Sequence, residues 1–514
     1  MAITAEASED ATSAGLFETR LRTTGLLLGP TSALLVYLVN PGGHPPAART
    51  LLAILALTVC FWITEAIPLP ATALLSSALA ILCGVAPARA VFEPYADPVI
   101  FLFIGSFLLA EAFGRYGLDR RVAARALGRE DKARGPMATV FGLGGATAFV
   151  SCWLSNTATA ALMTPMAVGL AGASDRPPED GPSRKGAGDP SRWVSALLLM
   201  VAYGASIGGM ATLVGTPPNL LVAGFLERLC GVKVGFAAWL LFGLPIALVL
   251  FAASLLWVRL FLLRGEDDGS ASWNRGPQAA SLPPSDRETA KGARLTIAAF
   301  LLAGILWMLP SAAAAILGAS SPVAQRLAAL LPESAVALFC AALLFVAPVD
   351  WRRRRFALSW REGRRVNWGI ILLFGGGLSL GTLAESTGLA RWVGEGLGGL
   401  GLARSESGLL FCAIALTIVV SEFASNTAAA TLLVPVVIAA AQTAGFDPVR
   451  PALGVGLAAT CGFIFPVSTP PNAIVYGTGL LPLRRMIPAG LLLDLTALVV
   501  IWGGMMLLSP VLPR

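Results

Sequence analysis

The chain has 514 residues, of which 56% are hydrophobic and only 13% are charged, with a mean hydropathy of +0.74. Soluble domains carry roughly 25% charged residues, so this composition excludes a soluble protein and indicates an integral membrane protein with many spans. The net charge of +7 does not indicate a nucleic-acid partner, because the basic residues cluster in short loops where they set membrane topology.

Apolar segments that predict membrane spans follow one another along the chain and are separated by two long hydrophilic loops, 175–192 and 264–294. The segments lie at about 22–39, 50–66, 69–85, 98–118, 137–173, 193–229, 234–263, 295–312, 333–349, 368–388, 407–446, 450–482 and 487–510. The seven cysteines show no metal-binding spacing, and the single histidine, His44, lies in a loop. We therefore expect no resident cofactor and no histidine-based proton relay.

Two matched sets of polar motifs interrupt these apolar segments. Ser-Asn-Thr occurs at Ser155–Thr157 and Ser425–Thr427, and Thr-Pro-Pro-Asn occurs at Thr216–Asn219 and Thr469–Asn472. Two consecutive prolines remove two backbone donors and break a helix, and such unwound backbone is tolerated at membrane depth only where protein or a cavity covers it. The second motif of each set therefore predicts a broken helix.

The Ser-Asn-Thr motifs lie near the middle of the long apolar stretches 137–173 and 407–446. Each stretch is either one crossing with a long tail or a helical hairpin that enters and leaves by the same side of the membrane. The central position of the polar triplet favours the re-entrant hairpin, with its turn at Ser-Asn-Thr.

An internal repeat links the two sets of motifs. The segment Phe103–Leu118 aligns without gaps to Phe374–Leu389, and the two Ser-Asn-Thr motifs have nearly the same offset. Many arginines follow Leu118, whereas few follow Leu389, and basic loops stay in the cytoplasm. The repeats are therefore expected to be inverted, as in secondary transporters, with a cytoplasmic N-terminus and the C-terminus outside the plasma (inner) membrane.

The fold expected from these patterns is an all-α polytopic membrane protein with inverted repeats, two re-entrant helical hairpins, two broken helices and about eleven transmembrane spans. Residues 1–136 are expected to form the first scaffold part with four spans, and 137–264 the first transport part. Residues 265–404 would supply the linker and the second scaffold part, and 405–514 the second transport part.

The motif regions are almost free of charge. Residues 137–174, 194–226 and 452–483 contain no Asp, Glu, Lys or Arg, and 407–446 contains only Glu422. Hydroxyl, amide and freed carbonyl oxygens suit a hard cation such as Na+, and the N-termini of half-helices suit an anionic group. Discontinuous transporter helices use both together.

At these residues the chain resembles the divalent anion/sodium symporter family, whose members carry dicarboxylates, citrate or sulfate. The resemblance covers both Ser-Asn-Thr motifs, both Thr-Pro-Pro-Asn motifs and the segment Ile63–Leu75, and it extends over roughly 20–510. It implies an elevator mechanism, a homodimer and Na+ as the coupling ion. The family often has Thr where this chain has Ser421, which keeps the hydroxyl but leaves ion preference open.

The resemblance also implies site residues. One Na+ site would use Ser151, Ser155, Asn156 and the carbonyl of Gly215, and its symmetry mate would use Ser421, the carbonyl of Ala424, Asn426 and the carbonyl of Ser468. The substrate would contact Asn156, Thr157, Thr216, Ser425, Asn426, Thr427, Thr469 and Pro470.

The sequence therefore predicts a secondary active transporter for sodium-coupled symport of a di- or tricarboxylate, with a C4-dicarboxylate such as succinate favoured. A carrier of sulfate or another divalent anion, a sodium-independent carboxylate exchanger and an anion channel are the alternatives. A channel predicts a continuous polar face along several spans, whereas polarity here concentrates at four breaks. An enzyme is not expected, because no nucleophile with a base and no facing pair of carboxylates is evident within the spans.

Five other acidic residues have two interpretations each. Glu65 is expected in a turn at the cytoplasmic face or in a gate. Glu111, Glu385 and Asp494 are expected to pair with a loop arginine or to relay protons. Glu422 is the acidic residue expected to matter most, because it adjoins the site residue Ser421.

Overall fold

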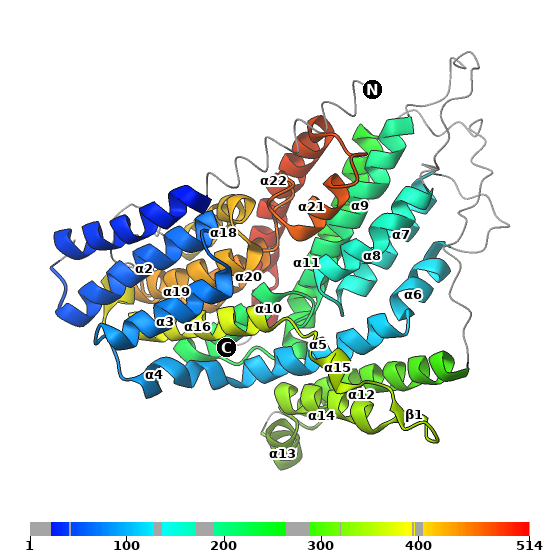
Figure 1. Cartoon of the computed structure of the whole chain (residues 1–514), viewed down its shortest axis with the longest axis horizontal. Coiled ribbons are helices and arrows are strands. Elements are labelled where there is room, and N and C mark those ends of the chain that lie inside the picture. Colours follow the sequence, from blue (N-terminus) through cyan, green and yellow to red (C-terminus); the bar gives the residue numbers. More distant parts are fainter. Residues whose placement is uncertain are drawn as a thin grey trace.

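The structure is a computed structural model, and it describes residues 22–40, 43–127, 136–170, 190–263, 287–318, 320–392, 395 and 405–512. These residues are mostly helical (Figure 1). Ten of the described helices are long and apolar enough to cross a membrane, or up to eleven if the bent pair α13–α14 is counted as one span. The expected all-α polytopic architecture is confirmed.

The first part of the chain begins with helices at one end of the molecule, and its last helix lies toward the other end (Figure 1). Asp97 starts the helix α5 (Pro98–Arg115), because the Asp97 carboxylate accepts a 3.0 Å hydrogen bond from the Val99 backbone N–H. The elements are the helix Arg22–Val39, then α2 (Pro46–Thr64), α3 (Leu69–Leu82), α4 (Ala88–Phe92), η1 (Glu93–Ala96), α5 (Pro98–Arg115) and α6 (Leu118–Leu127).

The first motif set follows in five helices. The first Ser-Asn-Thr separates α7 from α8, and the first Thr-Pro-Pro-Asn separates α9 from α10, as the sequence predicts. A Cβ atom at Gly208 of α9 would lie 2.6 Å from the Ala148 Cα of α7, so only glycine allows these two helices to pack so closely. The helices are α7 (Pro136–Ser151), α8 (Asn156–Leu170), α9 (Pro190–Ala211), α10 (Pro217–Cys230) and α11 (Phe236–Phe261).

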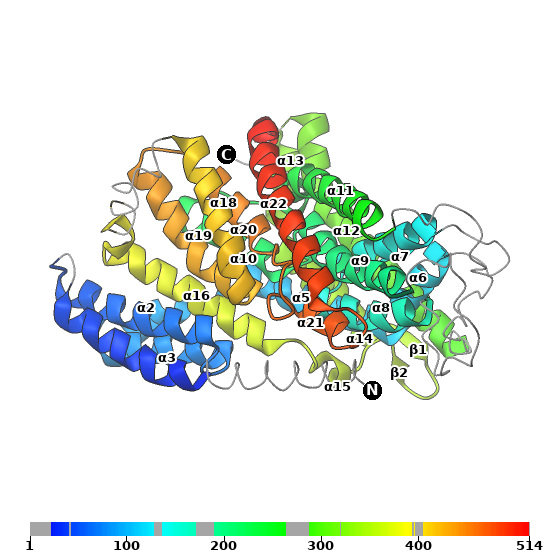
Figure 2. The ribbon, with the colours of Figure 1, turned by 90° about the horizontal axis from the view of Figure 1, so that it is seen from above.

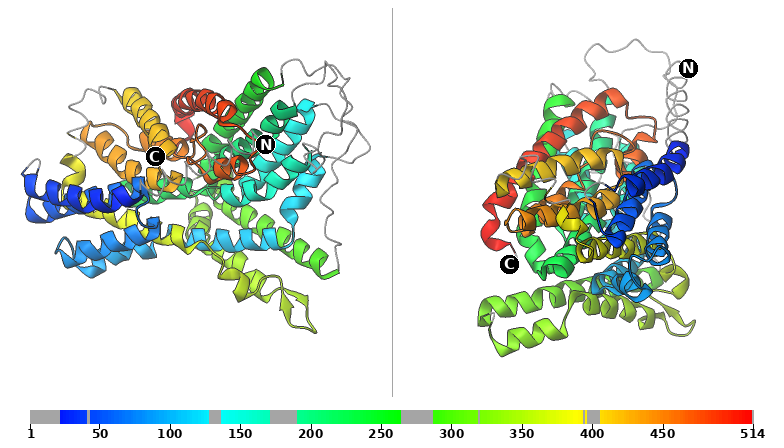
Figure 3. Two further views of the ribbon diagram at one scale, coloured as in Figure 1. Left: turned by 45° about the horizontal axis from the view of Figure 1, so that its top comes forward. Right: turned by 90° about the vertical axis from the view of Figure 1, so that its left-hand side faces the viewer.

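The next part returns to the helices of the first part, since α14 packs on α5 and α16 packs on α3. Two features were not predicted: a separate helix α13 and a small antiparallel hairpin of β1 and β2 within the basic stretch. Figure 3 shows α12–α14 along one side of the molecule. The elements are α12 (Arg287–Leu317), α13 (Pro322–Leu330), α14 (Glu333–Val346), β1 (Pro348–Asp350), β2 (Arg355–Phe356), α15 (Trp360–Gly363) and α16 (Trp368–Ser386).

The last part repeats the pattern of the first motif set. The second Ser-Asn-Thr separates α18 from α19, and an unwound segment ending in Thr469 separates α20 from α21. The elements are α18 (Glu406–Phe423), α19 (Asn426–Thr443), α20 (Val449–Ala458), α21 (Pro470–Tyr476), α22 (Leu483–Leu507) and η2 (Ser509–Val511).

The two motif sets exchange their broken helices. The hairpins α7–α8 and α18–α19 lie on opposite sides of α21 and α22 (Figure 2). The second half of each broken helix crosses to the other hairpin, since α10 packs on α19 and α20, while α21 packs on α8 and α9. This exchange joins both repeats into one unit and brings the motifs of each repeat to the hairpin of the other.

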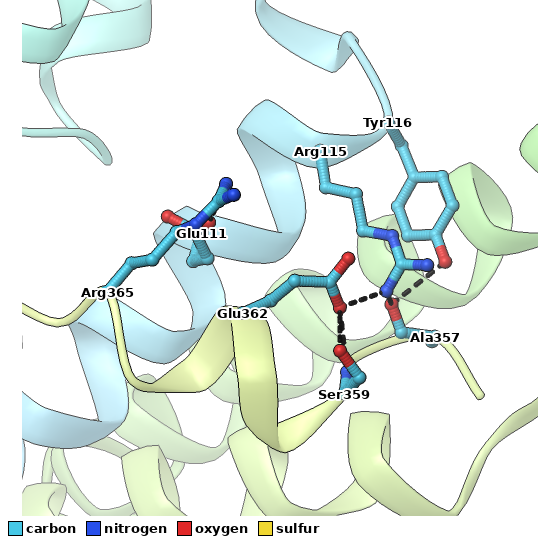
Figure 4. A network of polar contacts seen from close by, with 7 residues as sticks. All are labelled: Glu111, Arg115, Tyr116, Ala357, Ser359, Glu362 and Arg365. Carbon is cyan, nitrogen blue, oxygen red and sulfur yellow. Dashed lines mark hydrogen bonds and ion pairs between the residues drawn. The ribbon is translucent and has the colours of Figure 1, made fainter. Parts of the chain in front are cut away.

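A polar network ties the end of α5 to the segment before α16 (Figure 4). Arg115 forms an ion pair with Glu362, and the Tyr116 hydroxyl donates a 2.8 Å hydrogen bond to the Ala357 carbonyl. Arg365 and Glu111 form a second ion pair at 3.4 Å. Glu111 thus pairs with a loop arginine, which is the scaffold role expected for it.

Candidate functional site

Each Ser-Asn-Thr motif starts a helix through its serine. The Ser155 hydroxyl accepts a 3.3 Å hydrogen bond from the Ala158 N–H, and the Ser425 hydroxyl accepts one of 3.2 Å from the Ala428 N–H. Serine at this position satisfies a backbone donor that the first turn leaves free. The hairpin turns are therefore fixed by the motif itself, and α8 and α19 begin at its asparagine.

Four residues before each of these serines, a second serine joins the motif asparagine to a backbone carbonyl. Ser151 Oγ lies 3.0 Å from Asn156 Oδ1 and 2.6 Å from the Ala205 carbonyl. In the second repeat, Ser421 Oγ lies 3.1 Å from Asn426 Oδ1 and 2.7 Å from the Ala459 carbonyl.

A serine hydroxyl carries one hydrogen, so neither Ser151 nor Ser421 can donate to both of its neighbouring oxygens at once. Each cluster therefore holds more acceptor oxygens than donors. Such an arrangement suits a hard cation, which takes oxygen ligands only.

The asparagine of each Thr-Pro-Pro-Asn motif holds the unwound backbone in place. Asn219 Nδ2 donates to the carbonyls of Gly209 at 2.9 Å and Thr212 at 2.8 Å. Asn472 Nδ2 makes the corresponding bonds to Gly462 at 2.9 Å and to the Phe465 carbonyl at 3.0 Å.

The sequence analysis assigned no separate role to Asn219 or Asn472. Their matching positions in the two Thr-Pro-Pro-Asn motifs were the feature that could have indicated one. Both asparagines are fully buried, and their Oδ1 atoms have no hydrogen-bond partner among the described residues. These oxygens are therefore spare acceptors beside the two clusters.

Contacts across the first repeat join its two motifs. Asn156 Nδ2 lies 3.5 Å from Thr216 Oγ1. A Cβ atom at Gly209 would collide with Asn156 Oδ1, and one at Gly215 would lie 2.6 Å from the Gly209 carbonyl oxygen. The structure thus brings the expected ligands Ser151, Asn156 and Gly215 together. Only glycine fits at positions 209 and 215, where the end of α9 and the unwound backbone lie close to Asn156 and to each other.

The second repeat brings the corresponding elements together, with more room at its glycine. A Cβ atom at Gly462 would lie 3.2 Å from both the Ser421 carbonyl oxygen and Ser468 Cβ, and 3.3 Å from Thr469 Cγ2. The Thr469 hydroxyl accepts a 3.3 Å hydrogen bond from the Asn472 N–H and caps α21. The expected ligands Ser421, Asn426 and Ser468 therefore also belong to one cluster.

The expected ion ligands and the expected substrate contacts differ in how deeply they are buried. Among the expected ion ligands, Ser151, Ser421 and Ser468 are fully buried, Asn156 and Ala424 are buried, and Ser155 is half-buried. Among the expected substrate contacts, Thr157 and Pro470 are exposed, Ser425, Asn426 and Thr427 are half-buried, and Thr216 and Thr469 are buried. The ion ligands thus lie deeper than most of the substrate contacts.

All four motifs lie at helix N-termini, where backbone N–H groups give a partial positive charge. The helices α8, α10 and α19 have 15, 14 and 18 residues, long enough for this charge to develop, whereas α21 has 7. The motif regions carry no Lys or Arg. Positive charge for an anion would therefore come from helix ends and bound cations.

The two repeats differ at the residue after the buried serine. In the first repeat this residue is Cys152, whose carbonyl accepts a 2.5 Å hydrogen bond from Thr212 Oγ1. In the second repeat it is Glu422, which accepts hydrogen bonds from the N–H groups of Ile464 at 3.0 Å and Phe465 at 3.2 Å.

Ser468 completes the environment of Glu422. Its hydroxyl bonds to Glu422 Oε2 and lies 3.1 Å from the Glu422 carbonyl oxygen. Glu422 therefore holds the unwound segment of the second repeat by its side chain.

The expectations for acidic residues need one correction. Asp494 forms no ion pair with a loop arginine among the described residues; its Oδ2 accepts a 3.4 Å hydrogen bond from the Phe463 backbone N–H, next to the Ile464 and Phe465 N–H groups that Glu422 holds. The sequence showed no facing pair of carboxylates, because Glu422 and Asp494 are on different helices, α18 and α22, and only tertiary packing joins them. Glu65 lies in a turn, 3.8 Å from Arg22, and Glu385 is exposed.

Comparison with known proteins identifies the family. The family model described as the sodium:sulfate symporter transmembrane region matches residues 26–512. The chain belongs to this symporter family. The symporter family is the one that the motifs resemble, so the chain is a multi-pass membrane transporter and not an enzyme.

Symporter relatives match the chain over nearly its full length. The sodium-dependent dicarboxylate transporter SdcS of Staphylococcus saprophyticus is 31% identical over 485 residues, covering 93% of this chain and 89% of that protein. An uncharacterized transporter of Haemophilus influenzae is 33% identical over 486 residues, covering 94% and 96%. The SdcS protein of Staphylococcus aureus strain USA300 is 30% identical and covers 93% and 89%.

Two solved transporter structures share the fold. The Alcanivorax borkumensis YdaH transporter superposes with a TM-score of 0.53 at 17% identity, covering 85% of this chain and 88% of its own. Neisseria gonorrhoeae MtrF gives a TM-score of 0.56 at 15% identity, covering 83% of each chain. At this identity the likeness concerns the fold alone.

Proposed function

We propose that this transporter carries a C4-dicarboxylate such as succinate into the cell together with Na+. The observation that carries the proposal is the duplicated, uncharged oxygen cluster at Ser151–Asn156 and Ser421–Asn426, placed at helix N-termini. The relatives named as sodium-dependent dicarboxylate transporters support the same substrate class.

Two Na+ ions are transported as substrates at the two clusters. The first ion binds Ser151, Ser155, Asn156 and the Gly215 carbonyl, and the second binds Ser421, Asn426 and the carbonyls of Ala424 and Ser468. The close contacts of the Ser151 and Ser421 hydroxyls with neighbouring oxygens support this assignment, because Na+ would satisfy those oxygens together.

The dicarboxylate binds between the two hairpins, at the helix starts. It contacts Asn156, Thr157 and Thr216 of one repeat and Ser425, Asn426, Thr427, Thr469 and Pro470 of the other. Since no arginine or lysine lies in these regions, the dianion depends on the bound cations for charge neutralisation. Cation and anion therefore strengthen each other's binding, and the coupling is reciprocal.

Transport proceeds by an elevator movement in a homodimer. Residues 137–264 and 405–514 move as the transport part, while 1–136 and 265–404 form the scaffold. The packing of α11 on α22, of α5 on α14 and of α3 on α16 supports this division, and so do the crossed contacts of α10 and α21. Both hairpins are re-entrant, the N-terminus is cytoplasmic and the C-terminus lies outside the plasma (inner) membrane.

Uptake by purified protein in liposomes tests the function. Labelled succinate should accumulate only when a Na+ gradient points inward, and replacing Na+ by choline should abolish accumulation. Full uptake without sodium would contradict symport and favour exchange. Exchange would be faster in liposomes that were preloaded with succinate.

The family description names sulfate, which makes a sulfate carrier the second candidate. Thermal stabilisation of the detergent-solubilised protein separates the two, because a ligand that binds the folded state raises its melting temperature. Succinate should stabilise the protein and Na+ should increase the effect. Stabilisation by sulfate alone would reverse the assignment, and an anion channel would show no such sodium dependence.

A further inference from the structure

A cavity of about 700 Å³ lies where the first helices of the chain face the second hairpin. Its walls come from four helices, namely the helix Arg22–Val39, α2, α16 and α19. The helices α2, α16 and α19 pack on one another at the same end of the molecule (Figures 1 and 2). None of the described residues that line this cavity belongs to a Ser-Asn-Thr or Thr-Pro-Pro-Asn motif, so the cavity is separate from both oxygen clusters.

The lining of the cavity offers no free polar side chain. No Asp, Glu, Lys or Arg is among the described residues that line it. Each hydroxyl side chain on its walls donates to a backbone carbonyl three or four residues earlier in its own helix, and these side chains are Thr31, Ser32, Thr58 and Thr431. The Trp62 indole N–H lies 3.4 Å from the Leu69 carbonyl oxygen. A polar occupant would leave its own polar groups unpaired away from water, which costs free energy, so the lining suits a hydrocarbon.

The cavity lies at the depth of the hydrocarbon of the bilayer. Its lining residues on the helix Arg22–Val39 fall between positions 28 and 35, and those on α2 fall between positions 52 and 62. They therefore occupy mainly the interior of two spans. Leu28 and Leu35 line the cavity and are also 51% and 61% exposed, so the cavity opens toward the surface that a span presents to lipid. Acyl chains of the bilayer can reach it directly.

Small side chains keep the space between the helices open. A Cβ atom at Gly377 of α16 would collide with the Thr431 methyl group of α19, so these two helices touch at one wall of the cavity. Ala56 of α2 and Ala384 of α16 line the remaining space and do not fill it. Protein interiors contain few voids larger than a water molecule, and the volume of this cavity falls within the range of about 300–1,000 Å³ that ligand pockets have. The cavity therefore has the size and the chemistry of a site for an apolar ligand.

We propose that this cavity binds one acyl chain of a membrane phospholipid, whose headgroup stays at the membrane surface. The helix Arg22–Val39, α2 and α16 belong to the proposed scaffold, and α19 belongs to the proposed transport part. The bound chain contacts both parts at once and stabilises the arrangement in which the structure shows them. Binding of the chain does not depend on the substrate, whereas its effect on the transport part rests on the proposed function.

Native mass spectrometry of the detergent-purified protein tests the site. Ala56→Trp and Ala384→Phe fill the cavity from two of its walls, and each should remove one retained phospholipid per protein molecule. Ala312→Trp is the matched control, because Ala312 is exposed on α12 and lies outside the cavity, and this variant should retain the lipid. Added phosphatidylcholine should raise the melting temperature of the delipidated unchanged protein, since a ligand that binds the folded state stabilises it. The rise should be at least twofold smaller in Ala56→Trp and unchanged in Ala312→Trp.

Tryptophan fluorescence gives a second measurement, which keeps the test decisive if the filled variants do not fold. Trp62 lines the cavity, so phosphatidylcholine with brominated chains, added at a low ratio to protein in excess detergent, should quench its fluorescence. Trp62→Phe should lose most of this quenching. Trp368→Phe should keep it, because Trp368 is 48% exposed at the start of α16 and lies outside the cavity.

Two results would overturn the proposal directly: equal lipid retention by folded Ala56→Trp and unchanged protein, or quenching that survives Trp62→Phe. Loss of dimers in place of lipid in Ala56→Trp would also overturn it and would assign the cavity to a second copy of the chain. None of these measurements uses succinate or Na+. A failure of the proposed transport function would therefore be seen separately, in the uptake assay, and would leave the test of the lipid site intact.

Discussion

Gly209 provides the sharpest test of the first oxygen cluster. A Cβ atom at this position would collide with Asn156 Oδ1, so Gly209→Ala must displace the asparagine from Ser151. The corresponding glycine of the second repeat, Gly462, has looser surroundings, with no atom closer than 3.2 Å to an added Cβ. The same substitution should therefore affect the two clusters unequally.

The expected loss of Na+ affinity follows from the contacts that Asn156 would lose. Displacement removes its 3.0 Å hydrogen bond with Ser151, worth about 1 kcal/mol, and withdraws one oxygen from the first Na+ site. A combined loss of about 1.4 kcal/mol corresponds to a tenfold weaker apparent Na+ affinity. Overpacking should also lower the free energy of unfolding by about 1–3 kcal/mol. Gly462→Ala should weaken Na+ affinity by less than about threefold.

The measurement is the Na+ concentration for half-maximal succinate uptake, compared with the melting temperature of each variant. Gly304→Ala serves as the matched control, because no atom lies within 4 Å of its added Cβ. A folded Gly209→Ala variant with unchanged Na+ affinity would refute the assignment of Asn156. Equal effects of Gly209→Ala and Gly462→Ala would refute the steric argument.

Three further substitutions follow from the contacts. Asn219→Ala removes two bonds to backbone carbonyls and should lower the free energy of unfolding by about 2 kcal/mol, seen as a lower melting temperature. Ser151→Ala should raise the Na+ concentration for half-maximal uptake without changing the succinate preference. Arg228→Ala removes the ion pairs that join α10 to Glu93 and Asp97. If the transport part moves past η1, the turnover of succinate counterflow should rise about threefold, because these ion pairs no longer oppose the movement. An unchanged turnover would argue against that movement.

The local parts of the site could be predicted from the sequence. Proline pairs and capping serines act within a few residues, so the breaks at Pro217 and Pro470 and the hairpin turns at Asn156 and Asn426 were expected where the structure has them. The nearly constant sequence offset between the repeats also predicted that the two oxygen clusters would contain matching residues.

The contacts made by distant residues could not be predicted. The Ala205 and Ala459 carbonyls join the clusters only because α9 and α20 pack beside the hairpins, and no side chain distinguishes these alanines in the sequence. The meeting of Glu422 and Asp494 also depends on the packing of α18 and α22. In the basic stretch, Arg354 adopts a positive φ of 51° and turns the chain into a β-hairpin, which charge counting alone does not reveal.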